Sequence, residues 1–264
     1  MHDLPLNQAV GLLGLAAPEA PQLLAVVAHG DARSEQPLLW QLSSALSELG
    51  YGVTVLDATV NETERNPGLQ QLLDYEFGRN SADDDGPIWN VLPAGLGLQS
   101  LCALGTRPAH RLQRLGQTFQ TNGVIVLYAG VDYLVKLLPD SDIRPLLSVS
   151  SGKSSLLTSY LALKRLLRKA RLEPTILNMM EHAKEGQGTG AAGVAHALSE
   201  CARTFLAYEV NAIRIDPTQA ESQFNAEMRR LATRLLENAL ELKSPAPGDS
   251  GFAVSGFREL SRSH

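Results

Sequence analysis

The sequence is poor in several residue types, and each scarcity excludes a class of protein. Only two cysteines, Cys102 and Cys201, occur in 264 residues, so we expect neither a disulfide framework nor a cysteine metal site. No apolar run approaches the roughly 20 residues of a membrane-spanning helix, and the start lacks the basic region of a signal peptide. We therefore expect a cytoplasmic protein.

Positive charge is also scarce. Lys and Arg number 23 against 28 Asp and Glu, which gives a net charge of −5. Nucleic-acid-binding domains usually concentrate basic residues, and this composition gives no sign of such a surface. No nucleic-acid partner is expected.

What is abundant is apolar sequence in short, alternating patterns. Hydrophobic residues make up 44% of the chain, enough for a sizeable core. Alternating strands and helices predict a doubly wound, mainly parallel sheet with helices on both faces. The expected strands are 23–28, 53–58, 89–92, 123–127, 145–149, 174–179 and 208–215. The expected helices are 38–49, 64–78, 108–119, 154–169, one that ends near 206, and 225–242.

Three regions are expected along the chain. Residues 1–20 form an appendage helix and linker, 21–243 the α/β domain, and 244–264 a flexible tail rich in Pro and Gly. The tail has few apolar anchors and little positive charge, so we expect weak membrane contact or none.

Residues 24–37 connect an apolar strand to a helical pattern through a glycine-containing loop. An α/β nucleotide-binding protein holds phosphate at such a strand–loop–helix junction. A second segment, at 150–155, ends like a phosphate loop. It lacks the first glycine of the motif, and we interpret it as a turn with Ser154 or Ser155 capping the next helix. His29 and Cys102 have no catalytic partner at a recognisable spacing.

The order of landmarks across about residues 4–242 resembles the MinD/ParA family of P-loop ATPases, and more narrowly its flagellar number and placement regulators, FlhG and FleN. The N-terminal element of that branch corresponds to Asn7-Gln8-Ala9-Val10-Gly11-Leu12-Leu13. The later landmarks are Leu56-Asp57-Ala58-Thr59, Leu92-Pro93-Ala94-Gly95-Leu96-Gly97, Val126-Leu127-Tyr128-Ala129-Gly130, the helix from Ser155 to Lys164, and Ile176-Leu177-Asn178-Met179.

The resemblance implies a nucleotide loop that has lost its ligands. Phosphate loops use glycine amides, lysine charge and a Mg²⁺-binding hydroxyl. Here Gly30 and Glu35 replace the family's lysines, Gln36 replaces the hydroxyl, and Val126 replaces the switch aspartate. We expect no ATP hydrolysis, weak or no ATP binding, and no cofactor or metal. The full set of corresponding positions is Gly30, Asp31, Arg33, Glu35, Gln36, Asp57, Val126 and Asn178.

The function that the resemblance implies is a non-catalytic regulator or scaffold of flagellar number or placement. Its partners would be the flagellar signal-recognition-type GTPase or a transcription regulator, and a dimer is compatible with the family. Two alternatives stay open. One is an active ATP-dependent switch with a divergent loop, which would bind ATP and Mg²⁺. The other is a MinD-like accessory protein of polysaccharide secretion, pilus assembly or partition. The implied partner-binding residues are Asn7, Gln8, Ala9, Leu12 and Leu13.

Overall fold

A single, mainly parallel sheet organises the computed structural model, which describes residues 20–74, 89–103, 105, 107–119, 123–150, 153–179 and 191–242. The strand order is β3-β2-β4-β1-β5-β6-β7, and β8 pairs antiparallel with the start of β1. This confirms the predicted α/β fold class. The strands are β1 (Gln22–Ala28), β2 (Gly52–Asp57), β3 (Trp89–Pro93), β4 (Gly123–Gly130), β5 (Leu146–Val149), β6 (Thr175–Met179), β7 (Asn211–Ile215) and β8 (Leu240–Glu241).

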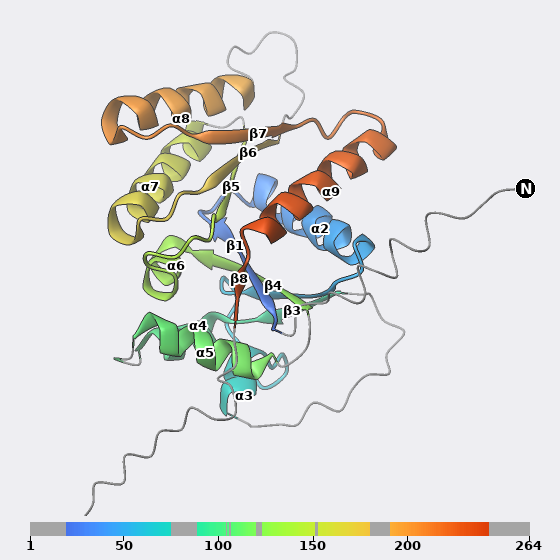
Figure 1. Ribbon diagram of the computed structural model, residues 1–264, viewed down its shortest axis with the longest axis vertical. Helices are drawn as coiled ribbons and strands as arrows, with labels where there is room; N and C mark the ends of the chain where they lie inside the picture. The colour runs from blue at the N-terminus through green and yellow to red at the C-terminus, as the bar shows by residue number, and fades with distance from the viewer. Residues whose placement is uncertain are drawn as a thin grey trace, which may run out of the picture.

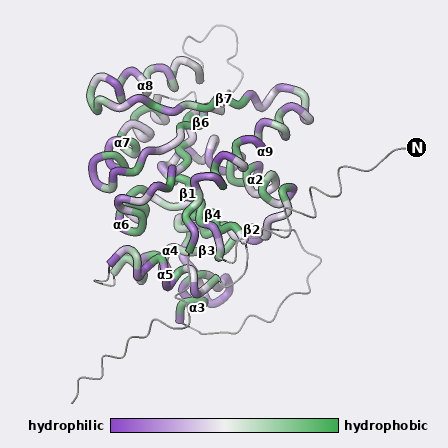
Figure 2. Tube along the Cα trace, in the orientation of Figure 1, coloured by the Kyte–Doolittle hydropathy of each residue, from purple (hydrophilic) through white to green (hydrophobic). Residues whose placement is uncertain are grey.

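The central strands are buried on both faces, which explains their continuous apolar sequences. The five inner residues of β1 are all buried, as are the six inner residues of β4. Register is continuous between them, from Gln22 opposite Val124 to Ala28 opposite Gly130. Figure 2 shows hydrophobic residues along these strands and hydrophilic ones on the outer sides of the helices.

Helices cover both faces of the sheet (Figure 1). α2 and α9 pack on one face, and the other described helices pack on the opposite face. None of the helices within the described residues is both long enough and apolar enough to cross a membrane. The helices are α2 (Ala32–Glu48), α3 (Leu69–Asp74), α4 (Gly95–Ala103), α5 (Pro108–Thr118), α6 (Val131–Leu137), α7 (Lys153–Ala170), α8 (Ala191–Leu206) and α9 (Glu221–Glu237).

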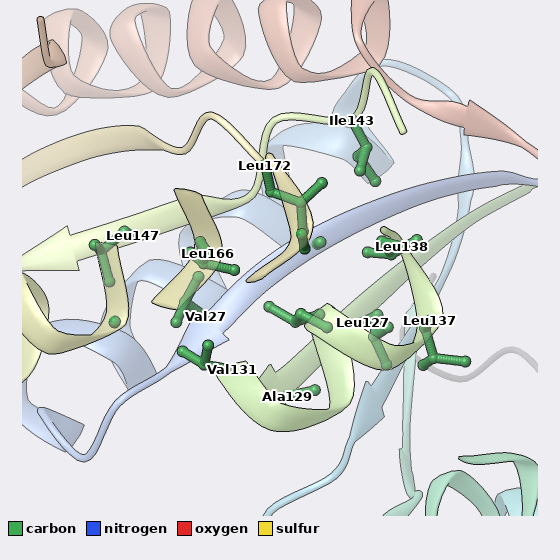
Figure 3. Packing of buried hydrophobic residues seen from close by; sticks show 14 of the residues in the cluster. Val27, Leu127, Ala129, Val131, Leu137, Leu138, Ile143, Leu147, Leu166 and Leu172 are labelled. Carbon is green, nitrogen blue, oxygen red and sulfur yellow. The ribbon is translucent and has the colours of Figure 1, made fainter. Parts of the chain in front are cut away.

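Two apolar clusters hold these layers together. The larger joins β1 and β4 to α6 and α7, and Figure 3 shows Val27, Leu127 and Leu166 among its members. The smaller places Val26 and Val126 against α2 and α9. Alternate residues of β1 pack against the helices on opposite faces of the sheet. The sheet therefore fixes both helical layers relative to the loop that follows β1.

The bounds of some predicted elements were wrong, and some of the observed elements were not predicted. The predicted helix 64–78 is formed only from Leu69, because Thr63 and Asn66 first pair in a tight turn. The predicted helix 225–242 ends at Glu237, and the chain then extends into β8. Helices α4 and α6 were not predicted. The appendage up to residue 19 and the tail 244–264 lie outside the described residues.

Helix α4 was missed because its start depends on a residue far away in sequence. Gly95 and Gly97 disfavour a helix by backbone entropy. The buried carboxylate of Glu62 compensates by accepting the amides of Leu96 (2.7 Å) and Gly97 (2.9 Å), which are free in a first helical turn.

We expect Gly97→Ala to lower the free energy of unfolding by about 1–3 kcal/mol, the usual cost of overpacking. A Cβ at Gly97 would lie 2.6 Å from Leu69 Cγ and 2.8 Å from the amide nitrogen of Gln70. Urea denaturation measures the change. Gly52→Ala is the control, since a Cβ there meets nothing within 4 Å. Equal stability of the two variants would contradict this packing.

Candidate functional site at the β1–α2 loop

The loop of residues 29–31 lies where β1 ends and α2 begins. Gly30 has φ +90°, a left-handed conformation that glycine adopts without strain. The loop sits at the carboxyl end of a central parallel strand, the edge where α/β proteins bind ligands. Its amides and the start of α2 together make a positively polarised cradle.

A carboxylate from the same chain occupies this cradle. Glu35, in the first turn of α2, is only 1% exposed. Its Oε1 accepts the backbone N–H of His29 (3.0 Å) and of Asp31 (2.9 Å). Its Oε2 accepts the hydroxyl of Tyr128 from β4. The side chain therefore turns into the loop and takes the amides that a bound anion would use.

Tyr128 and His29 complete the surroundings of this carboxylate. Burial, then the hydrogen bond and charge of Glu35, raise the pKa of Tyr128 well above its usual value, so its hydroxyl keeps its proton and donates. The His29 ring is almost fully buried, and its Nε2 donates to the Ser148 carbonyl (2.8 Å) and lies 3.4 Å from Glu35 Oε1. Its Nδ1 lies 3.0 Å from Thr158 Oγ1.

Serine and aspartate link the loop to β5 and α7. The Ser155 hydroxyl donates to Asp31 Oδ2 (2.7 Å) and accepts the Ser150 amide (3.0 Å), so Ser155 bridges two loops rather than capping its helix. Burial alone would raise the pKa of Asp31, but hydrogen bonds involving Ser150, Ser155 and Ser34 outweigh it and hold that pKa below its usual value. The Asp31 carboxylate is thus kept ionised.

The other predicted site residues are spread around this network. Arg33 and Gln36 are exposed near the start of α2. Asp57, at the end of β2, accepts the amide (2.9 Å) and hydroxyl (2.6 Å) of Thr59. Val126 and Asn178 are fully buried within β4 and β6. The predicted partner-binding residues at 7–13 lie outside the described residues.

Sequence reasoning missed Tyr128, Ser148 and Thr158 as parts of the site. The available signal was a polar group at the end of an apolar strand, which Tyr128 and Ser148 both present. Among the described residues, no three His, Cys, Asp or Glu side chains gather as a metal site would require. Burial raises the pKa of the Cys102 thiol on α4, which disfavours the nucleophilic thiolate.

The fold resembles that of several solved bacterial structures. The MinC:MinD cell division complex of Aquifex aeolicus superposes with a TM-score of 0.52 at 12% identity, over 84% of this chain and 98% of that one. A plasmid partition protein from Borrelia burgdorferi gives 0.52 at 13%, over 83% and 99%. Cobyrinic acid a,c-diamide synthase from Mycobacterium smegmatis, with bound ADP and magnesium, gives 0.53 at 12%, over 82% and 94%.

No protein-family model matches the sequence, and no curated protein sequence matches it. At 12–13% identity the structural likeness is one of fold. The chain has the α/β fold of the MinD/ParA P-loop ATPases.

We expect Asp31→Asn to destabilise the protein at neutral pH and to change its acid stability. Because folding lowers the pKa of Asp31, its ionised form stabilises the fold above the unfolded-chain pKa of about 3.9. That contribution is lost as the pH falls through the lower folded pKa. Urea denaturation at pH 7 and pH 3 should show the variant's deficit shrinking in acid. The control is Asp142→Asn at an exposed loop position, and a pH-independent deficit at Asp31 would refute the explanation.

Proposed function

We propose that this chain is a non-catalytic, MinD-like regulatory or scaffold protein, a pseudo-ATPase that acts through protein–protein contacts. The observation that carries the proposal is the Glu35 carboxylate in the amide cradle of the β1–α2 loop. A nucleotide phosphate would need the same amides. In this chain an internal anion already holds them.

Electrostatics opposes replacement of that carboxylate by a nucleotide. Two like charges 4 Å apart repel by about 1 kcal/mol in water and about 4 kcal/mol at the effective dielectric of a protein surface. Asp31 adds a second carboxylate to the loop, and its pKa is held low. At the position that corresponds to the family's phosphate-binding lysine, the chain carries Glu35. Displacing Glu35 would also cost its hydrogen bond from Tyr128.

The cellular role that we propose is control of flagellar number or placement in the cytoplasm, which follows from the resemblance of the N-terminal element to that branch. The partners would be the flagellar signal-recognition-type GTPase or a transcription regulator. A protein partner also suits the fold, since the MinD neighbour was solved as a complex with MinC. Membrane contact would be weak or absent. No observation on the site favours secretion, pilus or partition roles over this one.

The pseudo-ATPase proposal predicts that the protein neither hydrolyses ATP nor binds Mg-ATP with micromolar affinity. It also predicts that Glu35→Ala, which vacates the cradle, lowers the melting temperature and makes the protein more responsive to sulfate. Sulfate at millimolar concentration should recover stability in Glu35→Ala by more than it adds to the wild type, because the freed amides regain an anion. Calorimetry, an ATPase assay and thermal melts measure these effects.

Tyr128→Phe is the matched control, because it removes one donor and leaves the Glu35 carboxylate in place. It should lose stability without gaining a sulfate response. Mg-dependent turnover by the wild type would instead favour the active-switch alternative. A sulfate response equal in Glu35→Ala and the wild type would refute the occupied cradle.

The partner proposal predicts that deleting residues 1–16 weakens capture of the flagellar GTPase by about tenfold or more, because the deletion removes the implied partner-binding residues of the N-terminal element. A pull-down with purified proteins measures it, with a melt of the truncated chain to check folding. Equal capture by the full-length and the truncated chain would contradict a partner-binding role for residues 1–16.

A further inference from the structure

A hollow of about 200 Å³ lies between β7 and α9. β7 is the last strand of the sheet path and stands three strands from β1. Figure 1 shows α9 crossing the face beside β7, on the same side as α2. The hollow is therefore separate from the β1–α2 loop.

Arginine dominates the lining of the hollow. Arg230 and Arg234 lie one turn apart on α9, and Arg214 belongs to β7. All three are exposed. Within the described part of the chain, none of the three forms an ion pair.

Among the described residues that line the hollow, three are arginines and one, Glu227, carries a carboxylate. Glu227 Oε2 accepts a hydrogen bond from Gln219 Nε2 (2.7 Å). The adjacent Arg229 points elsewhere on α9, toward α2, where it lies 3.8 Å from Glu48 Oε2. The helix thus places one arginine in an ion pair and leaves two at the hollow.

This arrangement costs stability that an anion would restore. Like charges four residues apart on a helix destabilise it, and here they occur in a chain whose net charge is −5. Guanidinium groups bind phosphate through paired, charge-assisted hydrogen bonds. We propose that the β7–α9 hollow binds a phosphate group, either as free phosphate or as the phosphate of a small organic phosphomonoester.

The volume and the apolar lining of the hollow limit the class of ligand that it can bind. A cavity of about 200 Å³ is smaller than the roughly 300–1,000 Å³ of sites that enclose a drug-sized ligand. It suits one phosphate and a few attached carbon atoms. Ile213, Ile215 and Leu231 contribute apolar surface beside the arginines, which suits the carbon atoms of an ester. This binding needs neither Mg²⁺ nor the β1–α2 loop.

The test is calorimetry on the full chain at low ionic strength, without Mg²⁺, using inorganic phosphate in one arm and glycerol phosphate in the other. Arg230→Ala/Arg234→Ala should bind both at least about tenfold more weakly than the wild type. Tighter binding of glycerol phosphate than of phosphate would assign the site to an organic ester, and equal binding would assign it to free phosphate.

Arg229→Ala/Arg168→Ala is the matched control, because it removes two positive charges outside the hollow. It should bind like the wild type, and melts should show both double variants folded. Equal binding by the wild type and Arg230→Ala/Arg234→Ala would overturn the proposal. So would arginine-dependent binding of duplex DNA with no response to either phosphate.

Glu35 stays unchanged in every variant of this test. Failure of the hollow proposal can therefore be distinguished from failure of the proposal on the β1–α2 loop. Phosphate binding that survives loss of Arg230 and Arg234 and is displaced by Mg-ATP would refute the occupied loop. Absence of phosphate binding in the wild type would refute the hollow and leave the loop proposal intact.

Discussion

The site depends on one buried acidic side chain, that of Glu35. A charge that leaves water must be satisfied by donors, or the fold loses several kcal/mol. Two loop amides and the hydroxyl of Tyr128 satisfy this one. These donors come from the β1–α2 loop and from β4. The hydrogen bonds that the Glu35 carboxylate needs therefore fix the loop and β4 relative to α2. His29 extends the constraint to β5 and α7 through Ser148 and Thr158.

An internal anion has a thermodynamic advantage over a dissolved one at the same amides. A soluble phosphate loses translational and rotational freedom when it binds, whereas Glu35 is already tethered to the first turn of α2. The amide cradle and the helix dipole attract negative charge whatever its source. A glutamate in the first turn of α2 can therefore stabilise a strand–loop–helix junction of this kind in place of a bound phosphate.

Elements determined by the local residue pattern could be predicted from the sequence. Elements that depend on contacts with distant residues mostly could not. The strands were recognised because their continuous apolar residues are buried on both faces, as in β1. Helix α4 was not, because its glycines oppose a helix and its N-terminal amides are satisfied by Glu62, more than 30 residues earlier. Local propensity contains no information about such a partner.

The same distinction applies to the site. Glu35 was identified from its position, but as a charge that would repel a nucleotide. The Glu35 side chain turns inward because it accepts a hydrogen bond from Tyr128, which lies 93 residues later in the sequence. Ser148 and Thr158 were missed for the same reason, since His29 meets them only after β5 and α7 pack beside β1. Residue identity gave the chemistry available at the loop, and tertiary packing decided which groups use it.

The two candidate anion sites differ in whether their donors already have a negatively charged partner. At the β1–α2 loop the donors already have a carboxylate, whereas at the β7–α9 hollow three arginines are without an ion pair in the described structure. One helix pair connects the regions, because α9 packs on α2 and Arg229 faces Glu48. A ligand in the hollow could alter α2 only by binding two arrangements of α9 with different affinity. Each site otherwise acts on its own, so loss of nucleotide chemistry at the loop would leave recognition at the hollow unaffected.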